Sequence, residues 1–115
     1  MILVLGGTSD SLEICDRINR YEDLSYTLSV TTSYGEDLAR KHAKNVITGK
    51  LTKEDMVRFI EKNNINKIID ATHPYAIEVS KNAIQCAKEL NIDYLRYERK
   101  SLIEDISYEN KYIVS

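Results

Sequence analysis

Glycine and hydroxyl residues follow directly on the apolar run at residues 2–5. Gly6 and Gly7 carry no Cβ, so the backbone can turn sharply there and come close to a ligand. Thr8 and Ser9 offer side-chain oxygens where a helix needs an N-cap, and such a helix end presents N–H groups and a positive dipole to a phosphate. The junction therefore predicts a phosphate site. The third glycine of the Gly-x-Gly-x-x-Gly fingerprint is missing, however, and two glycines after a strand can equally form a structural turn.

A second group of hydroxyl side chains follows the next apolar run. Thr32, Ser33 and Tyr34 stand where a sheet that binds NAD usually carries Asp or Glu for the ribose 2′-hydroxyl. These residues donate hydrogen bonds without negative charge, so the position admits the 2′-phosphate of NADPH, and Arg40 or Lys41 could assist. The same hydroxyl groups would also suit a turn that caps a helix. We expect NADPH on this basis, with NADH as the alternative.

His73-Pro74 is the most unusual dipeptide, because Pro74 is the only proline in the chain and it closely follows an apolar run. We expect Pro74 to hold His73 extended and to begin the next helix. His73 could contact the nicotinamide end of a cofactor or donate a proton, although a lone histidine is more often a hydrogen-bonding residue of a loop. Asp70 is expected to orient loop backbone rather than to transfer a proton.

Other polar side chains indicate one further binding site and no metal centre. Arg96 and Arg99 follow the last apolar run at i, i+3 spacing and could pair with carboxylates of an acidic substrate, or with nearby glutamates. The two histidines are distant and no ligands cluster, so we expect no metal site. Cys15 and Cys86 fall among apolar neighbours and are expected to be buried.

Apolar runs alternate with segments of helical spacing along the chain. Strands are expected at residues 2–5, 26–30, 45–47, 67–69 and 93–95, and helices at residues 10–20, 35–43, 52–63 and 75–90. Strict alternation with short loops implies right-handed crossovers. We therefore predict an α/β fold with a Rossmann-like, doubly wound parallel sheet in three α/β/α layers. The carboxyl ends of parallel strands share one edge, where the loops described above should meet.

Two helices carry further local signals. Thr52 and Asp55 have the spacing of a capping box at the start of the third helix. The last helix is expected to lie on the sheet through a stripe of small and apolar residues. Its members are Ala76, Ser80, Ala83, Ile84 and Ala87.

Length and composition bound the remaining possibilities. The 115 residues suit one domain, and a net charge of −2 without a basic run argues against non-specific nucleic-acid binding. No apolar stretch is long enough to cross a membrane and the N-terminus lacks the features of a signal peptide, so we expect a cytoplasmic protein without a membrane partner. Residues 111–115 resemble the start of another strand, which suggests a fragment or half-protein, or else an edge strand that closes the sheet.

Five motifs together resemble the precorrin-6A reductase family of corrin-ring (cobalamin) biosynthesis, including its cobalt-precorrin branch. They are Gly6-Gly7-Thr8-Ser9-Asp10, Thr32-Ser33-Tyr34-Gly35, Gly49-Lys50-Leu51, Asp70-Ala71-Thr72-His73-Pro74-Tyr75-Ala76 and Arg96-Tyr97-Glu98-Arg99. The resemblance implies an oxidoreductase that transfers hydride from NADPH or NADH to a double bond of a tetrapyrrole macrocycle, its small-molecule substrate. It also implies two Rossmann-like halves with the cofactor between them. Residues 1–115 would be the nucleotide-binding half, and the C-terminal lobe would be missing.

The resemblance also implies a role for each motif. The phosphates would be held by Gly6, Gly7, Thr8 and Ser9, and the adenosine ribose would face Thr32, Ser33 and Tyr34. The rest of the cofactor cleft would be lined by Gly49, Lys50, Thr72, His73 and Tyr75, and the substrate would meet Arg96 and Arg99. His73 and Tyr75 are the candidates for the proton donor.

Two other classes of protein stay open. The chain could be a nucleotide-binding module without catalysis. It could also be another Rossmann-like NAD(P)-binding protein, such as half of a sugar-nucleotide epimerase or a regulatory ligand-binding domain. Against an epimerase, no Tyr-x-x-x-Lys pair stands on a helix, since Val79 occupies the fourth position after Tyr75.

Overall fold

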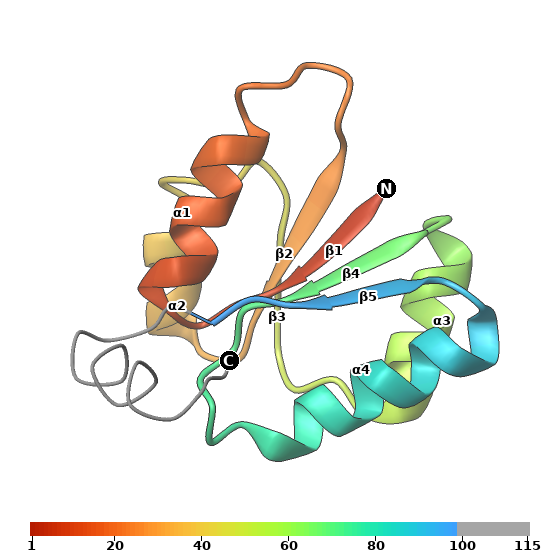
Figure 1. Cartoon of the computed structure of the whole chain (residues 1–115). Coiled ribbons are helices and arrows are strands. Elements are labelled where there is room, and N and C mark those ends of the chain that lie inside the picture. The colour runs from red at the N-terminus through yellow and green to blue at the C-terminus, as the bar shows by residue number, and fades with distance from the viewer. Residues whose placement is uncertain (99–115) are drawn as a thin grey trace, which may run out of the picture.

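The computed structural model describes residues 1–98, which form a parallel sheet flanked by helices (Figure 1). The strands are β1 (Ile2–Leu5), β2 (Tyr26–Val30), β3 (Val46–Thr48), β4 (Lys67–Asp70) and β5 (Asp93–Arg96). The helices are α1 (Ser9–Ile18), α2 (Ser33–Ala39), α3 (Lys53–Lys62) and α4 (Ile77–Leu90). The strand order is β3-β2-β1-β4-β5, with every pair parallel.

Helices cover both faces of the sheet, with α1 and α2 on one face and α3 and α4 on the other (Figure 1). Successive strand side chains point to opposite faces, and β1 shows this clearly. Leu3 and Leu5 pack in the cluster that includes residues of α3 and α4, whereas Val4 packs in the cluster that includes residues of α1 and α2. All three side chains are buried. The predicted three-layer, Rossmann-like α/β fold is confirmed.

The order of the strands reverses at β1. β2 and β3 lie on one side of β1, and β4 and β5 lie on its other side. Leu5, the last residue of β1, pairs with Ser29 of β2 and with Asp70 of β4. The carboxyl ends of these strands are therefore level with one another. Doubly wound sheets bind their ligands in the crevice at such a switch point.

Threonine side chains cap the first three helices. Thr8, Thr32 and Thr52 each accept a hydrogen bond from a backbone N–H in the first turn of the helix that follows. Asp55 accepts in return from the Thr52 N–H, which confirms the predicted capping box. Each cap fixes where its helix begins relative to the strand before it.

The last helix begins later than predicted. α4 starts at Ile77, and Pro74 lies before it in a turn. In this turn the Ala76 N–H donates to the His73 carbonyl oxygen, and the Tyr75 N–H donates to the His73 ring. The prediction that Pro74 begins the helix was therefore wrong, because local hydrogen bonds to His73 hold the chain in a turn first.

The end of one helix and one packing residue also differ from the prediction. α2 ends at Ala39 instead of residue 43, because the Lys41 and His42 N–H groups donate to carbonyls only three residues back. On α4, Ile84 is 39% exposed, so the buried stripe is continued by Cys86 instead. The burial predicted for both cysteines is confirmed. Arg99 and the strand expected at residues 111–115 lie outside the described residues.

Candidate functional site

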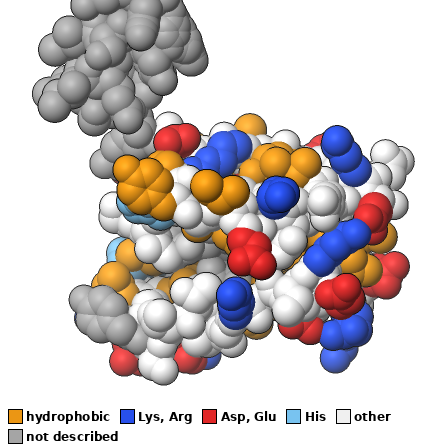
Figure 2. All heavy atoms as spheres, turned by 90° about the horizontal axis from the view of Figure 1, so that it is seen from below, with side chains coloured by type: hydrophobic (Ala, Val, Ile, Leu, Met, Phe, Trp, Pro, Cys, Tyr) orange, Lys and Arg blue, Asp and Glu red, His pale blue; other side chains and the backbone are white. Residues whose placement is uncertain are grey.

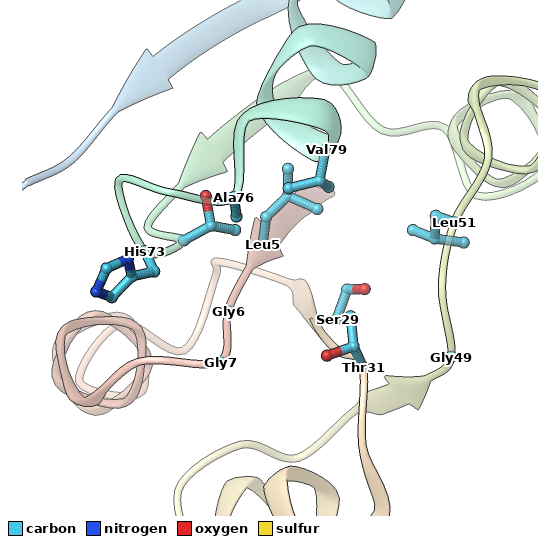
Figure 3. Close-up of a pocket in the computed structure, with 11 residues that line it drawn as sticks. Leu5, Gly6, Gly7, Ser29, Thr31, Gly49, Leu51, His73, Ala76 and Val79 are labelled. Carbon is cyan, nitrogen blue, oxygen red and sulfur yellow. The ribbon is translucent and has the colours of Figure 1, made fainter.

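A pocket of about 200 Å³ lies at the carboxyl edge of the sheet, where the loops after β1 to β4 meet (Figure 3). We call it the central pocket. The chain after β1 contributes Gly6 and Gly7, and the loop after β4 contributes Thr72 and His73. The other lining residues are Leu5, Ser29, Thr31, Gly49, Leu51, Ala76 and Val79. The pocket therefore spans the switch point between β1 and β4.

A second pocket of about 300 Å³ adjoins the first, and we call it the outer pocket. The two pockets share Gly7 and Thr31. The rest of the outer pocket is formed by Thr8, Ser9, Leu12, Val30, Thr32, Gly35 and Leu38. It combines apolar walls with the N-terminal ends of α1 and α2. An elongated ligand could thus cross from one pocket to the other over Gly7.

The two glycines after β1 have different tasks. The Gly6 N–H donates to the Ser29 carbonyl oxygen, and a Cβ on Gly6 would stand 2.6 Å from the Leu28 Cδ1 atom. The absence of a side chain at Gly6 thus lets the Leu28 side chain of β2 pack against this position. Gly7 has φ +100°, a conformation that side chains disfavour, and a Cβ there would meet nothing within 4 Å. The open space beside Gly7 is room for a ligand.

Thr8 holds the turn after β1 in place through its side-chain hydroxyl. Its hydroxyl donates to the Ala71 carbonyl oxygen at 2.6 Å and accepts from the Ser11 N–H at 3.1 Å. The hydroxyl is therefore engaged within the protein, and it ties the turn after β1 to the loop after β4. Ser9 is exposed at the first position of α1, where a helix does not satisfy its own N–H groups. The helix dipole adds positive potential at the same place.

Only some of the predicted ligand residues after β2 line the outer pocket. Thr32 lines it and accepts from the Gly35 N–H at 3.0 Å, while Ser33 is exposed and does not line it. Tyr34 belongs to α2, but the structure does not describe its side chain. Arg40, which could assist a 2′-phosphate, pairs at 2.6 Å with Glu36. This hydrogen bond lowers the pKa of Glu36.

The loop after β3 brings a second open glycine to the central pocket. Gly49 has φ +124°, and a Cβ there would meet nothing within 4 Å. Its N–H donates to the Val30 carbonyl oxygen, which fixes the loop against β2. Lys50 is exposed and lines neither pocket, and Leu51 forms the wall at this position instead.

His73 stands at the mouth of the central pocket (Figure 3). Its Nδ1 accepts from the Tyr75 N–H at 3.1 Å, so the neutral ring carries its proton on Nε2. The Nε2–H group is then the one that can face a ligand. Tyr75 does not line either pocket and is 85% exposed, and its ring lies 4.9 Å from the His73 ring.

Asp70 is fully buried beneath the loop after β4. Its Oδ1 accepts from the Thr72 N–H, the Thr72 hydroxyl and the Arg96 guanidinium. Its Oδ2 accepts from the Ser80 and Tyr94 hydroxyls. Burial by itself raises the pKa of Asp70, but the hydrogen bonds outweigh burial, and the pKa is lowered. As predicted, Asp70 orients loop backbone, and it does so as a carboxylate.

The Asp70 network also engages two residues predicted to bind ligands. The Thr72 hydroxyl donates to Asp70, so Thr72 meets the central pocket with its hydroxyl already used. The Arg96 guanidinium lies 3.0 Å from both the Asp70 Oδ1 and the Thr72 hydroxyl. Arg96 therefore neutralises a buried carboxylate. Whether it also meets the substrate stays a prediction, as does the role of Arg99.

Several lining residues escaped the sequence analysis. Ser29 is a strand residue and Val79 a helix residue, so both read as parts of an element rather than of a site. Leu51 and Ala76 stand inside the motifs but are apolar, so their only signal is their place after a strand or at the start of a helix. Thr31 immediately follows β2, and its hydroxyl is the signal that could have marked it.

The face of the molecule in Figure 2 carries charged side chains of both signs. In Figure 2, Lys and Arg side chains are interspersed with Asp and Glu side chains, without a large area of one sign. Within residues 1–98 there is no group of His, Cys, Asp and Glu side chains that could hold a metal ion. Over the same residues no helix has the length and apolar character needed to span a membrane.

Known proteins resemble this chain in both sequence and structure. A family model for precorrin-6x reductase CbiJ/CobK matches residues 1–114. Cobalt-precorrin-6A reductase from Methanocaldococcus jannaschii is 46% identical over 109 residues, covering 95% of this chain and 43% of that protein. The protein of that name from Priestia megaterium is 43% identical over 116 residues, covering 100% of this chain and 44% of its own length.

Two solved structures share the fold. CobK precorrin-6A reductase superimposes with a TM-score of 0.72 at 22% identity, covering 86% of this chain and 37% of that one. Apo saccharopine dehydrogenase from Saccharomyces cerevisiae gives a TM-score of 0.69 at 15% identity, covering 91% of this chain and 23% of that one. The chain spans less than half the length of the curated relatives described above. On the match over residues 1–114, the chain belongs to the precorrin-6x reductase CbiJ/CobK family.

Proposed function

We propose that this chain is the nucleotide-binding half of a reductase that transfers hydride from NADPH to a double bond of precorrin-6A or cobalt-precorrin-6A. One observation carries the proposal: the central pocket, at the switch point between β1 and β4, adjoins at Gly7 the outer pocket, which lies at the ends of β1 and β2. The substrate class comes from the relatives, whose names include cobalt-precorrin-6A reductase.

The residues at the two pockets fit a nicotinamide nucleotide. The space beside Gly7, where a side chain would otherwise project, admits a pyrophosphate next to the N-terminus of α1. The adenosine would lie in the outer pocket, against Leu12 and Val30 and near Thr32. The nicotinamide would lie in the central pocket beside His73. When bound, the reduced nicotinamide supplies the hydride.

The protein must also supply a proton to complete reduction of the double bond. His73 lines the central pocket, and its imidazolium form would give up the Nε2 proton and return to neutral imidazole. Forming that imidazolium requires Nδ1 to release the Tyr75 N–H, from which it accepts in this structure, and to take up a proton. We propose His73 as the donor. The exposed Tyr75 hydroxyl is the second candidate.

NADPH is the proposed nucleotide because no carboxylate immediately follows β2. The position after Val30 holds Thr31 and Thr32, and Glu36 on α2 is paired with Arg40. A 2′-phosphate would therefore meet hydroxyl groups rather than a free negative charge.

A second lobe would complete the active site. The relatives are more than twice as long as the part that this chain matches, so their additional length can supply the other wall of the cleft. A cleft with two walls excludes water and orients the macrocycle. We propose that Arg96 and Arg99 contact the substrate in this completed cleft. We also propose that the whole reductase is cytoplasmic.

Nucleotide titration of the chain tests the site. We expect NADPH to bind more tightly than NADH and Gly7→Glu to abolish binding, because a bulky carboxylate would fill the phosphate space. Gly7→Ala is the matched control, since it imposes the same backbone strain with little bulk and should keep most of the affinity. Failure of the parent chain to bind either nucleotide, or full binding by Gly7→Glu, would refute the proposed site.

A chimera tests the activity. This chain would replace the matching part of the Methanocaldococcus jannaschii relative, which is 46% identical over that region. We expect the chimera to reduce cobalt-precorrin-6A with NADPH. The reaction is measured as the loss of the absorbance of the reduced nicotinamide. A chimera that binds NADPH but reduces nothing would make this chain a binding module without catalysis.

A further inference from the structure

The carboxylate of Asp70 joins a functional loop to two elements of the scaffold. Asp70 is the last residue of β4, and the loop that follows it carries Thr72 and His73 into the central pocket. The carboxylate is fully buried beneath this loop, so it does not reach solvent or the ligand itself. Any effect it has on a ligand must pass through the residues it holds.

The two oxygens of the carboxylate serve different neighbours. Oδ1 faces the loop and accepts from the Thr72 N–H at 3.1 Å and from the Thr72 hydroxyl at 2.7 Å. Oδ2 faces the scaffold and accepts at 2.6 Å from Ser80 of α4 and at 2.6 Å from Tyr94 of β5. Asp70 therefore ties the loop backbone to the next helix and the next strand at once.

The loop continues directly from this anchor to the nucleotide site. One residue after Thr72, the His73 carbonyl oxygen accepts from the Ala76 N–H, and its Nδ1 accepts from the Tyr75 N–H. The direction in which this turn leaves β4 is set at Thr72. On the other side of the anchor, the Ala71 carbonyl oxygen accepts from the hydroxyl of Thr8, which lies in the turn after β1.

We infer that Asp70 is a positioning residue of the nucleotide site: by fixing the backbone at Thr72, it holds the His73 turn at the central pocket. This inference rests on the proposed function. Arg96 has the role of counter-ion in this arrangement, because it lies 3.0 Å from Oδ1 and donates to the Thr72 hydroxyl as well. The Thr72 hydroxyl thus makes two charge-assisted contacts, one with the Asp70 carboxylate and one with the Arg96 guanidinium.

Two variants at position 70 separate positioning from bulk. In Asp70→Asn the amide oxygen can still accept from Thr72, while the amide nitrogen can donate to the Ser80 and Tyr94 hydroxyls, which can turn to accept. Asp70→Ala removes both acceptors. We expect Asp70→Ala to weaken NADPH affinity about tenfold or more, the size of one lost hydrogen bond to a charged group, and Asp70→Asn to restore most of it.

Amide hydrogen exchange supplies a readout that does not depend on the nucleotide. The Tyr75 and Ala76 N–H groups report the His73 turn, and the Asp55 N–H in the α3 cap reports the scaffold. In Asp70→Ala we expect exchange at Tyr75 and Ala76 to accelerate about tenfold relative to Asp55. If the parent chain binds no nucleotide, the proposed function fails, and this measurement still decides whether Asp70 holds the turn.

A pair at the neighbouring position covers the case in which Asp70→Ala does not fold. Thr72→Val keeps the bulk but deletes the hydroxyl bond to Asp70, whereas Thr72→Ser keeps that bond. We expect only Thr72→Val to accelerate exchange in the turn. The inference would be overturned if exchange at Tyr75 and Ala76 were unchanged in both Asp70→Ala and Thr72→Val, or if the Asp55 N–H accelerated equally. If Asp70→Ala does not fold, unchanged exchange at Tyr75 and Ala76 in Thr72→Val would be enough to overturn it.

Discussion

Neighbouring residues of one motif can have unrelated physical tasks. Gly6 leaves room for the Leu28 side chain, whereas Gly7 leaves room for a ligand and adopts a φ that few side chains tolerate. The hydroxyl of Thr8, the next residue in the motif, donates to the Ala71 carbonyl oxygen and accepts from the Ser11 N–H. The motif after β1 thus combines one packing residue, one open position and one structural cap.

The lowered pKa of Asp70 predicts how the free energy of unfolding depends on pH. Its pKa in the folded chain is below the ordinary value of 3.8, because hydrogen bonds from Ser80, Tyr94 and Thr72 outweigh the effect of burial, which raises it. Its contribution to the free energy of unfolding is therefore complete at neutral pH. The contribution is lost as the pH falls through the ordinary value toward the lowered one.

Urea unfolding of the parent and of Asp70→Asn between neutral pH and about pH 3 checks this sign. We expect the difference in free energy of unfolding between the two to shrink as the pH falls. Asp55→Asn is the control, because its pKa is also lowered but its side chain is 40% exposed, so its effect should be smaller. Parallel curves for the parent and Asp70→Asn would contradict the argument.

At the residue scale, the sequence predicted which strand ends meet but not which hydroxyl groups remain available. Thr8 and Thr72 were predicted to bind the cofactor, and both lie at the pockets, yet each hydroxyl has a partner inside the protein. The partner of Thr72 is Asp70, the last residue of β4, and the partner of Thr8 is Ala71, in the loop after β4. The type and spacing of nearby residues cannot reveal the bond between Thr8 and Ala71, which are 63 positions apart.

Elements begin where a side chain or a turn satisfies the first N–H groups. α3 begins after Thr52 as predicted, because its cap is complete within four residues. The last helix was predicted at residues 75–90 with Pro74 at its beginning, but α4 begins at Ile77. Its N-cap Ala76 makes no side-chain hydrogen bond, and the turn at His73 delays its start. Local caps can be found from sequence, whereas a turn held by a histidine ring leaves no such pattern.

Two capped helices allow a matched prediction. Thr8 and Thr52 both belong to capping boxes, but only the Thr8 hydroxyl also donates to the buried Ala71. We expect Thr52→Ala to cost about 1 kcal/mol of unfolding free energy. Thr8→Ala should cost about 2–3 kcal/mol, because it also leaves a buried carbonyl oxygen unpaired.

Urea unfolding measures both losses. Thr8→Ser and Thr52→Ser serve as controls, because each keeps the hydroxyl and should restore most of the stability. Equal losses for the two alanine variants would show that the bond between Thr8 and Ala71 contributes nothing to holding the turn after β1 against the loop after β4.

At the scale of the whole molecule, the sheet separates two apolar clusters. One contains Cys15 of α1 with Val4, and the other contains Cys86 of α4 with Leu3 and Leu5. β1 contributes to both, because its side chains alternate between the faces. The alternation of strands and helices was enough to predict these layers. The joined pockets depend on the handedness and order of the connections, so only the assembled sheet displays them.

The two cysteines can show whether both clusters open together. Both thiols are fully buried; burial raises the pKa of Cys15 to about 11 and also raises the pKa of Cys86. The thiolate is the reactive form, so neither should react with a disulfide reagent at neutral pH in the folded chain. Because β1 links the clusters, we expect one cooperative unfolding event to expose both thiols.

Cys15→Ala and Cys86→Ala each leave one reporter, on opposite faces of the sheet. The labelling rate of each variant is measured across urea concentrations and compared with its own free energy of unfolding, since either substitution destabilises a buried site by itself. We expect the protection of the remaining thiol to equal the global stability in both variants. If a thiol labels about tenfold faster than the rate expected from global unfolding of its variant, the helical layer that covers it opens separately from the sheet.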